Sequence, residues 1–161
     1  MKLRDFEKYL PIAILFVAAC GNGAKHEPEP GQVIFPSDYQ SSYTLVYDCR
    51  QSGDHDLMNV RMLADEAALG PYRDREESFP EGAVVLKEQY DFGDPDCQGD
   101  IQLWTVMEKL AEGSSPETLD WRWQSVDADR KVTNQNDSRC TSCHSVCGVP
   151  PDGYEGTCVI P

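Results

Sequence analysis

The sequence predicts an α+β domain that consists mainly of an antiparallel β-sheet, with a few helices and a cysteine-containing segment near the C-terminus. Three observations lead to this fold class. Short runs of β-branched and aromatic residues recur along the chain, which is typical of strands. Stretches that contain Gly and Pro separate these runs. Helical segments do not alternate with them, as a parallel sheet would require.

Five segments are expected to form strands: residues 43–47, 60–63, 83–90, 101–110 and 121–123. The first has aromatic and β-branched residues, and the second is a short apolar run. The third follows a turn at Pro80-Glu81-Gly82 and begins apolar on both faces. The fourth is bulky and apolar. In the fifth, Trp121 and Trp123 lie two residues apart, so both rings belong to one face.

The segments between these strands predict a helix and two polar connections. Residues 65–69 predict a short helix that ends at Gly70-Pro71, because proline cannot continue the helical hydrogen bonding. Residues 91–100 form an acidic loop around Cys97. This loop lacks the spacing of an EF-hand, so a solvent-exposed hairpin connection is expected. Residues 134–139 are polar and lead into the C-terminal cysteines.

The first nineteen residues are typical of a secretion signal. A basic start precedes an apolar run, 10–19, which is shorter than the ~20 residues of a membrane-spanning helix. The run ends in Val17-Ala18-Ala19-Cys20-Gly21, a pattern that predicts cleavage before Cys20 and lipid on its thiol. An ordinary secretion signal with an incidental cysteine is the alternative. A lipidated Cys20 would place the protein in the bacterial cell envelope, facing the periplasm, and Gly21 favours the outer membrane.

The rest of the chain is expected to contain one tether and one domain. Residues 20–32 carry Gly, Pro and Glu and few side chains that could pack, so they predict a flexible tether. Residues 33–161 are long enough for a single domain. No internal repeat divides this part of the sequence.

The chain is strongly acidic, with a formal net charge of −14. An acidic surface repels nucleic acid and anionic lipid head groups. No nucleic-acid partner is therefore expected, and the membrane would be reached only through the lipid anchor. The same charge could attract a cationic redox partner in the periplasm, although solubility alone would also account for it.

Cys140-Thr141-Ser142-Cys143-His144 is a C-x-x-C-H motif, the signature of c-type haem attachment. Two thiols three residues apart can form thioethers with the two vinyl groups of one haem. The adjacent His144 can then bind the iron as the proximal axial ligand. The sequence therefore predicts one covalent haem c, attached through Cys140 and Cys143, with His144 as the metal ligand.

Three other interpretations use the same residues. A thiol redox centre would be expected within alternating strands and helices, which the sequence does not show. Cys140, Cys143, His144 and Cys147 offer the ligand types that zinc prefers, although four ligands within eight residues would be crowded. In the third interpretation the chain is a cofactor-free surface lipoprotein stabilised by disulfides.

The second axial position of a haem has no clear ligand in this sequence. His26 lies in the tether and His55 in a polar stretch. Met58, Met62 and Met107 could each offer a thioether, but each more simply fills apolar space. The sequence therefore favours an open sixth site, at which a small molecule could bind the iron.

Four motifs occur in a fixed order: Asn59-Val60-Arg61-Met62-Leu63, then Phe79-Pro80-Glu81-Gly82-Ala83-Val84-Val85-Leu86-Lys87-Glu88, then Asp120-Trp121-Arg122-Trp123, and finally the C-x-x-C-H run. In these motifs the chain resembles the cytochrome P460 family and its relatives, the beta-type cytochromes c-prime. The last motif is common to many cytochromes. The Phe-Pro-Glu-Gly segment that ends in Lys87-Glu88 makes the resemblance specific.

This resemblance implies a mainly antiparallel sheet with a five-coordinate haem, usually in a homodimer. Cytochromes P460 oxidise hydroxylamine and carry a lysine cross-linked to their haem. Beta-type cytochromes c-prime lack the cross-link and bind gases such as nitric oxide. Lys87 stands at the position of the cross-linking lysine, and Arg61 matches a family arginine near the haem, so both are candidate catalytic residues. The alternatives are a strand-end lysine that reaches solvent and an arginine in a surface ion pair.

The acidic distal residue of the hydroxylamine-oxidising relatives has no obvious counterpart here. Its position falls near Trp104 or Thr105, and neither side chain is a base. Glu108 is close, but a shift of one residue along a strand changes its face. Without a carboxylate to accept protons, hydroxylamine oxidation would lack an expected contributor. Ligand binding or electron transfer is therefore favoured, and whether the protein is an enzyme stays open.

Once lipid and haem are assigned, Cys49, Cys97, Cys147 and Cys158 remain. An exported protein has an oxidising environment, and this even number would suit two disulfides. Cys147 and Cys158 bracket a Gly- and Pro-containing loop and could pair, which would leave Cys49 with Cys97. The sequence alone does not establish this connectivity.

The leading hypothesis is a periplasm-facing monohaem cytochrome. It would bind, oxidise or reduce small nitrogenous ligands such as nitric oxide and hydroxylamine, or transfer electrons. The second hypothesis is a hydroxylamine-oxidising enzyme in which Lys87 is cross-linked to the haem. The third is a cofactor-free or zinc-binding surface lipoprotein.

Overall fold

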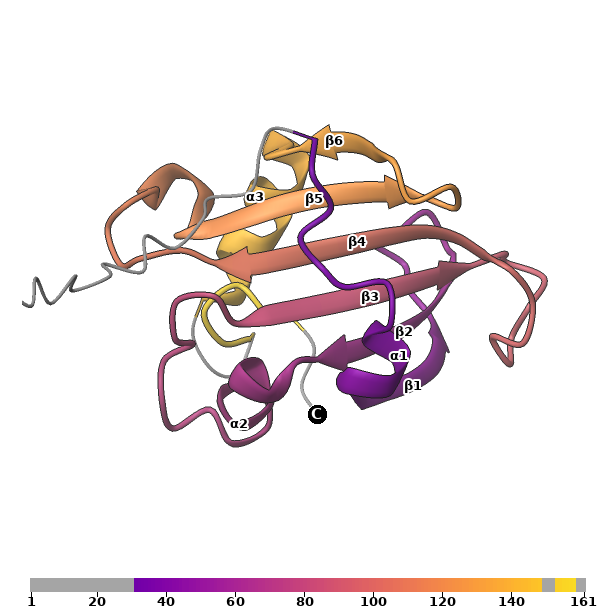
Figure 1. Cartoon of the computed structure of the whole chain (residues 1–161), viewed down its shortest axis with the longest axis horizontal. Helices are drawn as coiled ribbons and strands as arrows, with labels where there is room; N and C mark the ends of the chain where they lie inside the picture. The colour runs from indigo at the N-terminus through magenta and orange to yellow at the C-terminus, as the bar shows by residue number, and fades with distance from the viewer. Residues whose placement is uncertain (1–30, 149–152, 159–161) are drawn as a thin grey trace, which may run out of the picture.

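Six strands form one antiparallel sheet, in the order in which they occur along the chain (Figure 1). The strands are β1 (Thr44–Gln51), β2 (Asn59–Ala64), β3 (Val84–Tyr90), β4 (Ile101–Lys109), β5 (Trp121–Asp127) and β6 (Val132–Gln135). Each pairs with the next in antiparallel register. The predicted α+β fold with a mainly antiparallel sheet is confirmed.

This computed structural model describes residues 31–148 and 153–158. The predicted signal peptide, the lipidated Cys20 and most of the expected tether, with His26, lie outside the described residues. Within the described part of the chain, no helix is both long and apolar enough to cross a membrane.

Within residues 31–148 and 153–158, three short helices and two 3₁₀ turns accompany the sheet. They are α1 (Tyr39–Ser42), α2 (Glu66–Asp74) and α3 (Ser138–His144), with η1 (Pro116–Thr118) and η2 (Ser145–Cys147). The C-x-x-C-H motif thus forms most of α3, and η2 follows it directly.

Helix α2 begins where predicted, but the prediction that it ends at Gly70-Pro71 is wrong. The Asp65 side chain caps its start by accepting a hydrogen bond from the backbone N–H of Ala68 (2.8 Å). The helix then continues through Pro71 to Asp74, and Arg75, whose φ is 56°, caps its C-terminus. Pro71 removes only one helical N–H donor, and the buried Tyr72 holds the second turn against the core.

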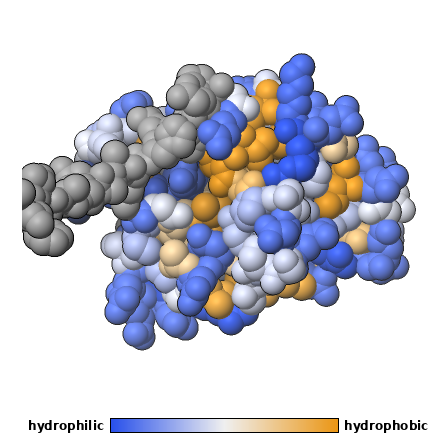
Figure 2. Space-filling view, in the orientation of Figure 1, coloured by the Kyte–Doolittle hydropathy of each residue, from blue (hydrophilic) through white to orange (hydrophobic). Residues whose placement is uncertain are grey.

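The two faces of the sheet carry two different cores, because side chains alternate along each strand. On one face, residues of β3, β4 and β5 pack with α2 and with Phe79. On the other, alternate residues of the same strands pack beneath the segment that contains Phe35 and Tyr39. Figure 1 shows this segment in front of the sheet and α3 behind it. On the front face, apolar residues form patches among hydrophilic ones (Figure 2).

Candidate functional site

A cavity of about 490 Å³ lies on the face of the sheet that carries α3. Its walls come from β3, β4 and β5, from the β1–β2 loop, from α3 and from residues 157–158. This volume is within the range of small-molecule and cofactor sites. Its lining residues include Arg50, His55, Met62, Lys87, Thr105, Met107, Trp123, Cys140, Cys143 and His144.

Helix α3 presents all three chemically active residues of the C-x-x-C-H motif to this cavity. The Asp137 side chain caps the helix by accepting from the backbone N–H of Arg139 (2.8 Å). Residues three and four positions apart share one face of a helix. Cys140, Cys143 and His144 therefore line the same cavity.

The two motif cysteines carry free thiols. Cys140 is partly buried and Cys143 exposed, and burial raises the pKa of the Cys140 thiol. The remaining described cysteines form the disulfides Cys49–Cys97 and Cys147–Cys158. Both thiols that thioether attachment would require are thus available at the cavity.

The His144 imidazole is oriented by a backbone carbonyl. Its Nδ1 lies 2.5 Å from the carbonyl oxygen of Gly156. A carbonyl only accepts, so Nδ1 carries the proton and Nε2 keeps its lone pair. Burial lowers the pKa of His144, which favours the neutral imidazole that ligates metals. The ring also packs against Trp123, with centroids 4.7 Å apart.

Lys87 and His55 form a polar pair in the cavity. The Nζ atom of Lys87 lies 2.6 Å from Nε2 of His55. Burial, reinforced by the charge of Arg50, lowers the pKa of Lys87 to about 8. Burial and the nearby Lys87 lower the pKa of His55 to about 3. At neutral pH the ammonium of Lys87 therefore donates to a neutral imidazole.

His55 was considered from the sequence only as an axial ligand and set aside, but it lines the cavity. It lies in the β1–β2 connection, which folds back through hydrogen bonds from the Ser52 N–H to the Met58 carbonyl and from the Met58 N–H to the His55 carbonyl (both 2.9 Å). Strand β2 pairs with β3, and Met62 lies opposite Lys87. The sequence did offer one indication of this role: His55 lies in the loop that leads into the strand paired with the one that carries Lys87.

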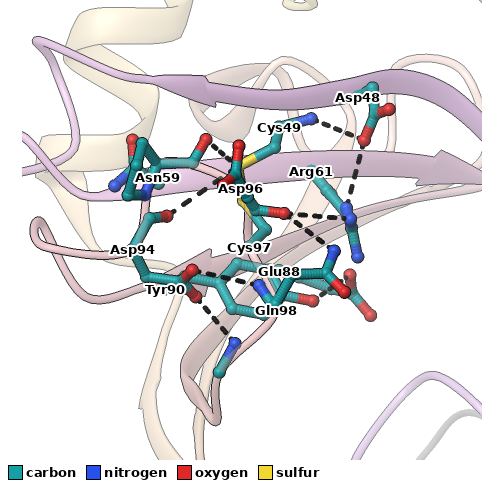
Figure 3. Close-up of a disulfide and its surroundings, with 12 residues drawn as sticks. Asp48, Cys49, Asn59, Arg61, Glu88, Tyr90, Asp94, Asp96, Cys97 and Gln98 are labelled. Carbon is teal, nitrogen blue, oxygen red and sulfur yellow. Dashed lines mark hydrogen bonds and ion pairs between the residues drawn. A yellow bond between two sulfur atoms is a disulfide. The ribbon is translucent and has the colours of Figure 1, made fainter.

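Arg61 is not brought to this cavity. It pairs with Glu88 across β2 and β3, one position away from the Met62–Lys87 pair, and therefore points to the opposite face of the sheet. Its Nε lies 3.2 Å from Asp48 Oδ1 and its guanidinium is 5.7 Å from the Tyr90 ring. Figure 3 shows Arg61 beside the Cys49–Cys97 disulfide. Arg61 therefore forms an ion pair on the other face of the sheet, which is the alternative to a role near the haem.

Like Arg139, Arg50 lines the cavity. Its guanidinium lies 4.3 Å from the Tyr47 ring centroid. Among the described residues, its buried Nε has no hydrogen-bond partner. A buried donor without an acceptor is costly, so this atom suits an anionic group such as a haem propionate.

Strand β4 brings no carboxylate into the cavity. Thr105 lines it and accepts a hydrogen bond from the Gln89 side chain (3.1 Å). Trp104 packs in the core of the opposite face, and Glu108 pairs there with Arg122 (3.1 Å). This arrangement agrees with the expectation that a distal carboxylate is missing from this strand.

Of the methionines considered as second ligands, Met62 and Met107 line the cavity, whereas Met58 does not. Met62 accepts a hydrogen bond from the Tyr72 hydroxyl through its sulfur (3.6 Å), and Met107 belongs to the core.

The zinc interpretation is not supported by the arrangement of ligands. Cys147 is bonded to Cys158 and so cannot act as a thiolate. In the described part of the chain, no group of three or more His, Cys, Asp or Glu residues is arranged to hold a metal ion.

Two free thiols, a neutral histidine and an arginine with an unpaired Nε lie around one cavity and fit the vinyl groups, iron and propionate of a haem. A sequence model of the cytochrome P460 family matches residues 36–148. The chain therefore belongs to the cytochrome P460 family, as its motifs predicted, and this membership indicates a haem-binding cytochrome. No curated protein shows significant sequence similarity to the chain.

Proposed function

We propose that this chain is a c-type monohaem cytochrome that binds small nitrogenous ligands or exchanges electrons. Cys140 and Cys143 would hold the haem, and Nε2 of His144 would ligate its iron. The observation that carries the proposal is that all three side chains line one cavity. The hydrogen bond from Nδ1 to Gly156 leaves Nε2 free to act as a ligand.

Attachment of the haem needs no oxidant. Each thiol adds across a vinyl C=C bond, so that sulfur bonds to one carbon and its hydrogen passes to the other. The unpaired Nε of Arg50 would meet a propionate. When bound, the haem supplies an iron that takes up small ligands and changes oxidation state by one electron.

The polar pair in the cavity would then act on the bound ligand. His55 accepts from Lys87 and so holds the ammonium in the cavity, where it can donate a hydrogen bond to a ligand such as nitric oxide or hydroxylamine. Strand β4 supplies no carboxylate, and the carboxylates that do line the cavity, Asp54, Asp56 and Asp137, come from the β1–β2 loop and the start of α3. The absence of a proton acceptor on β4 favours ligand binding and electron transfer over oxidation.

Haem attachment is tested on denatured protein that has been expressed with a cytochrome c maturation system. We expect a haem-stained band that survives boiling with reductant, and a reduced pyridine spectrum of c type. The double variant Cys140→Ala/Cys143→Ala should lose the band. The matched control Ser142→Ala, in the same motif, should keep it. A wild-type chain without haem would overturn the proposal and favour a cofactor-free lipoprotein.

Ligand binding is tested by titrating the ferrous protein with nitric oxide. An open sixth site predicts a five-coordinate, high-spin spectrum before the addition and saturable binding after it. A low-spin, six-coordinate starting spectrum would contradict the open site, and His55 and Met62 would then be the first candidate ligands.

A second candidate function is hydroxylamine oxidation, because Lys87 lies in the cavity with a pKa of about 8. A partly neutral amine could bond to a haem carbon. The nitrogen and the carbon would each lose a hydrogen, so two electrons and two protons must leave, and an oxidant of the peroxide class is needed.

The cross-link is tested with Lys87→Arg, and Lys131→Arg serves as the control. A cross-link predicts that only Lys87→Arg restores an ordinary c-type spectrum and the mass of the unlinked haem protein. It also predicts loss of hydroxylamine oxidation. Identical spectra for the two variants and the wild type, with each mass equal to the value calculated for its own unlinked haem protein, would rule the cross-link out.

The proposal also includes the location and partners that the sequence predicts. Lipid on Cys20 would anchor the domain in the outer membrane, facing the periplasm, with a cationic redox partner and a homodimeric state. Cys20→Ser should release the protein from the membrane fraction. Retention of this variant in that fraction would contradict the anchor.

A further inference from the structure

The carbonyl group that orients His144 belongs to a tight turn near the C-terminus. Two backbone hydrogen bonds between Tyr154 and Thr157 close this turn (3.0 and 2.8 Å). Gly156 within it has a φ of +88°, a conformation that glycine adopts without steric cost. The turn therefore presents the Gly156 carbonyl in one direction, toward Nδ1 of His144.

A disulfide connects this turn to the helical segment that carries His144. Cys147 ends η2, directly after α3, and is bonded to Cys158, the residue that follows the turn. The Gly156 N–H also donates to the Cys147 carbonyl (3.1 Å). The Sγ atom of Cys158 lies only 3.7 Å from Nδ1 of His144. The disulfide, the turn and the imidazole thus form one connected unit.

The sheet supports the same turn from the other side. The indole N–H of Trp121 donates to the Glu155 carbonyl (2.8 Å). Trp121 is fully buried, so this bond fixes the turn against the core. The disulfide supplies the covalent connection between this anchored turn and the segment that follows His144.

We propose that the Cys147–Cys158 disulfide is a positioning element for the axial histidine. It holds the Gly156 carbonyl against Nδ1 and thereby sets the donor strength of Nε2 toward the iron. This inference rests on the proposed role of His144 as the axial ligand. It assigns a function in the haem site to two cysteines that lie outside the attachment motif.

The expected effect follows from the hydrogen bond. An imidazole whose Nδ1–H donates to a carbonyl is a stronger electron donor through Nε2. A stronger donor stabilises ferric over ferrous iron. Loss of the disulfide would let the carbonyl move away, weaken the iron–histidine bond and raise the reduction potential.

The test compares two double variants of the haem-loaded protein, Cys147→Ala/Cys158→Ala and Cys49→Ala/Cys97→Ala. Each loses one disulfide, but Cys49 and Cys97 lie beside Arg61 (Figure 3) and neither lines the cavity. Only the first is expected to lower the iron–histidine stretching frequency of the ferrous form and to raise the reduction potential. Unchanged values in the first variant, with haem retained, would overturn the inference. Equal changes in both variants would also overturn it.

A second measurement covers the case in which the first variant does not fold. Each disulfide has one buried cysteine, but the accessible partner is exposed in the case of Cys158 and only partly exposed in the case of Cys49, so a mild phosphine reductant should open the Cys147–Cys158 disulfide first in the folded protein. The stretching frequency should fall on reduction and recover on reoxidation. An unchanged frequency after complete opening of this disulfide would contradict the inference. A wild-type protein without an iron–histidine vibration would instead contradict the proposed function.

Discussion

The lowered pKa of Lys87 predicts an unusual chemical reactivity. The pKa falls from 10.5 to about 8, mainly because the side chain is buried. At pH 8 about half of these amines are then neutral, against roughly 0.3 % for an ordinary lysine. Only the neutral amine acts as a nucleophile. Lys87 should therefore become reactive at a pH well below that required by an ordinary lysine.

The assay is acylation of the haem-free chain by a small amine-reactive reagent, followed by peptide mass spectrometry at each lysine. We expect the labelling rate of Lys87 to be half-maximal near pH 8. The exposed Lys131 provides the internal reference for reagent reactivity. His55→Leu should remove the acceptor at 2.6 Å and lower the midpoint further, because the ammonium loses a hydrogen bond. A midpoint at or above 10.5 for Lys87 would refute the argument.

Two further predictions concern stability. Tyr39→Phe should cost about 2–4 kcal/mol, because its hydroxyl donates to the buried Glu88 (2.7 Å) and accepts from Trp104 (2.9 Å), whose indole N–H would then be unsatisfied. Tyr90→Phe removes the bond to Glu88 (2.8 Å) but leaves no buried indole N–H unsatisfied, so it should cost less, about 1–2 kcal/mol; urea unfolding in which Tyr90→Phe costs as much as Tyr39→Phe would contradict this. Burial lowers the pKa of His55 from 6.5 to about 3, so below pH 6.5 the unfolded chain takes up a proton that the folded chain does not. Stability should then fall by about 1–3 kcal/mol between pH 6.5 and pH 4, and His55→Gln should reduce this slope in unfolding measured across that range.

The strands that carry strong local patterns were predicted from the sequence, and those held by their neighbours were not. Residues 83–90 and 101–110 coincide closely with β3 and β4, because both contain several β-branched or bulky apolar residues close together. Strand β6 was missed. Three of its four residues are exposed, and it depends on pairing with β5. Exposed polar residues carry no periodic signal from which such a strand could be predicted.

The candidate site shows the same division between local and long-range information. Cys140, Cys143 and His144 were predicted together because the C-x-x-C-H signature is local in the sequence, and helix α3 then places them on one face. The face of Arg61 depends on the register between β2 and β3, and a difference of one residue turns a side chain from one face to the other. Arg50 and His55 reach the cavity through a strand and a loop whose geometry is fixed only by the assembled sheet.

The cavity residues also bear on the choice between ligand binding and oxidation. Oxidation of hydroxylamine releases protons, so it benefits from a base that is unprotonated yet reasonably basic at neutral pH. His55, with a pKa of about 3, is unprotonated but weakly basic. Lys87, with a pKa of about 8, is mostly protonated. The pair is therefore better suited to donating a hydrogen bond to a ligand than to removing its protons, and any oxidase activity should increase as the pH rises through 8.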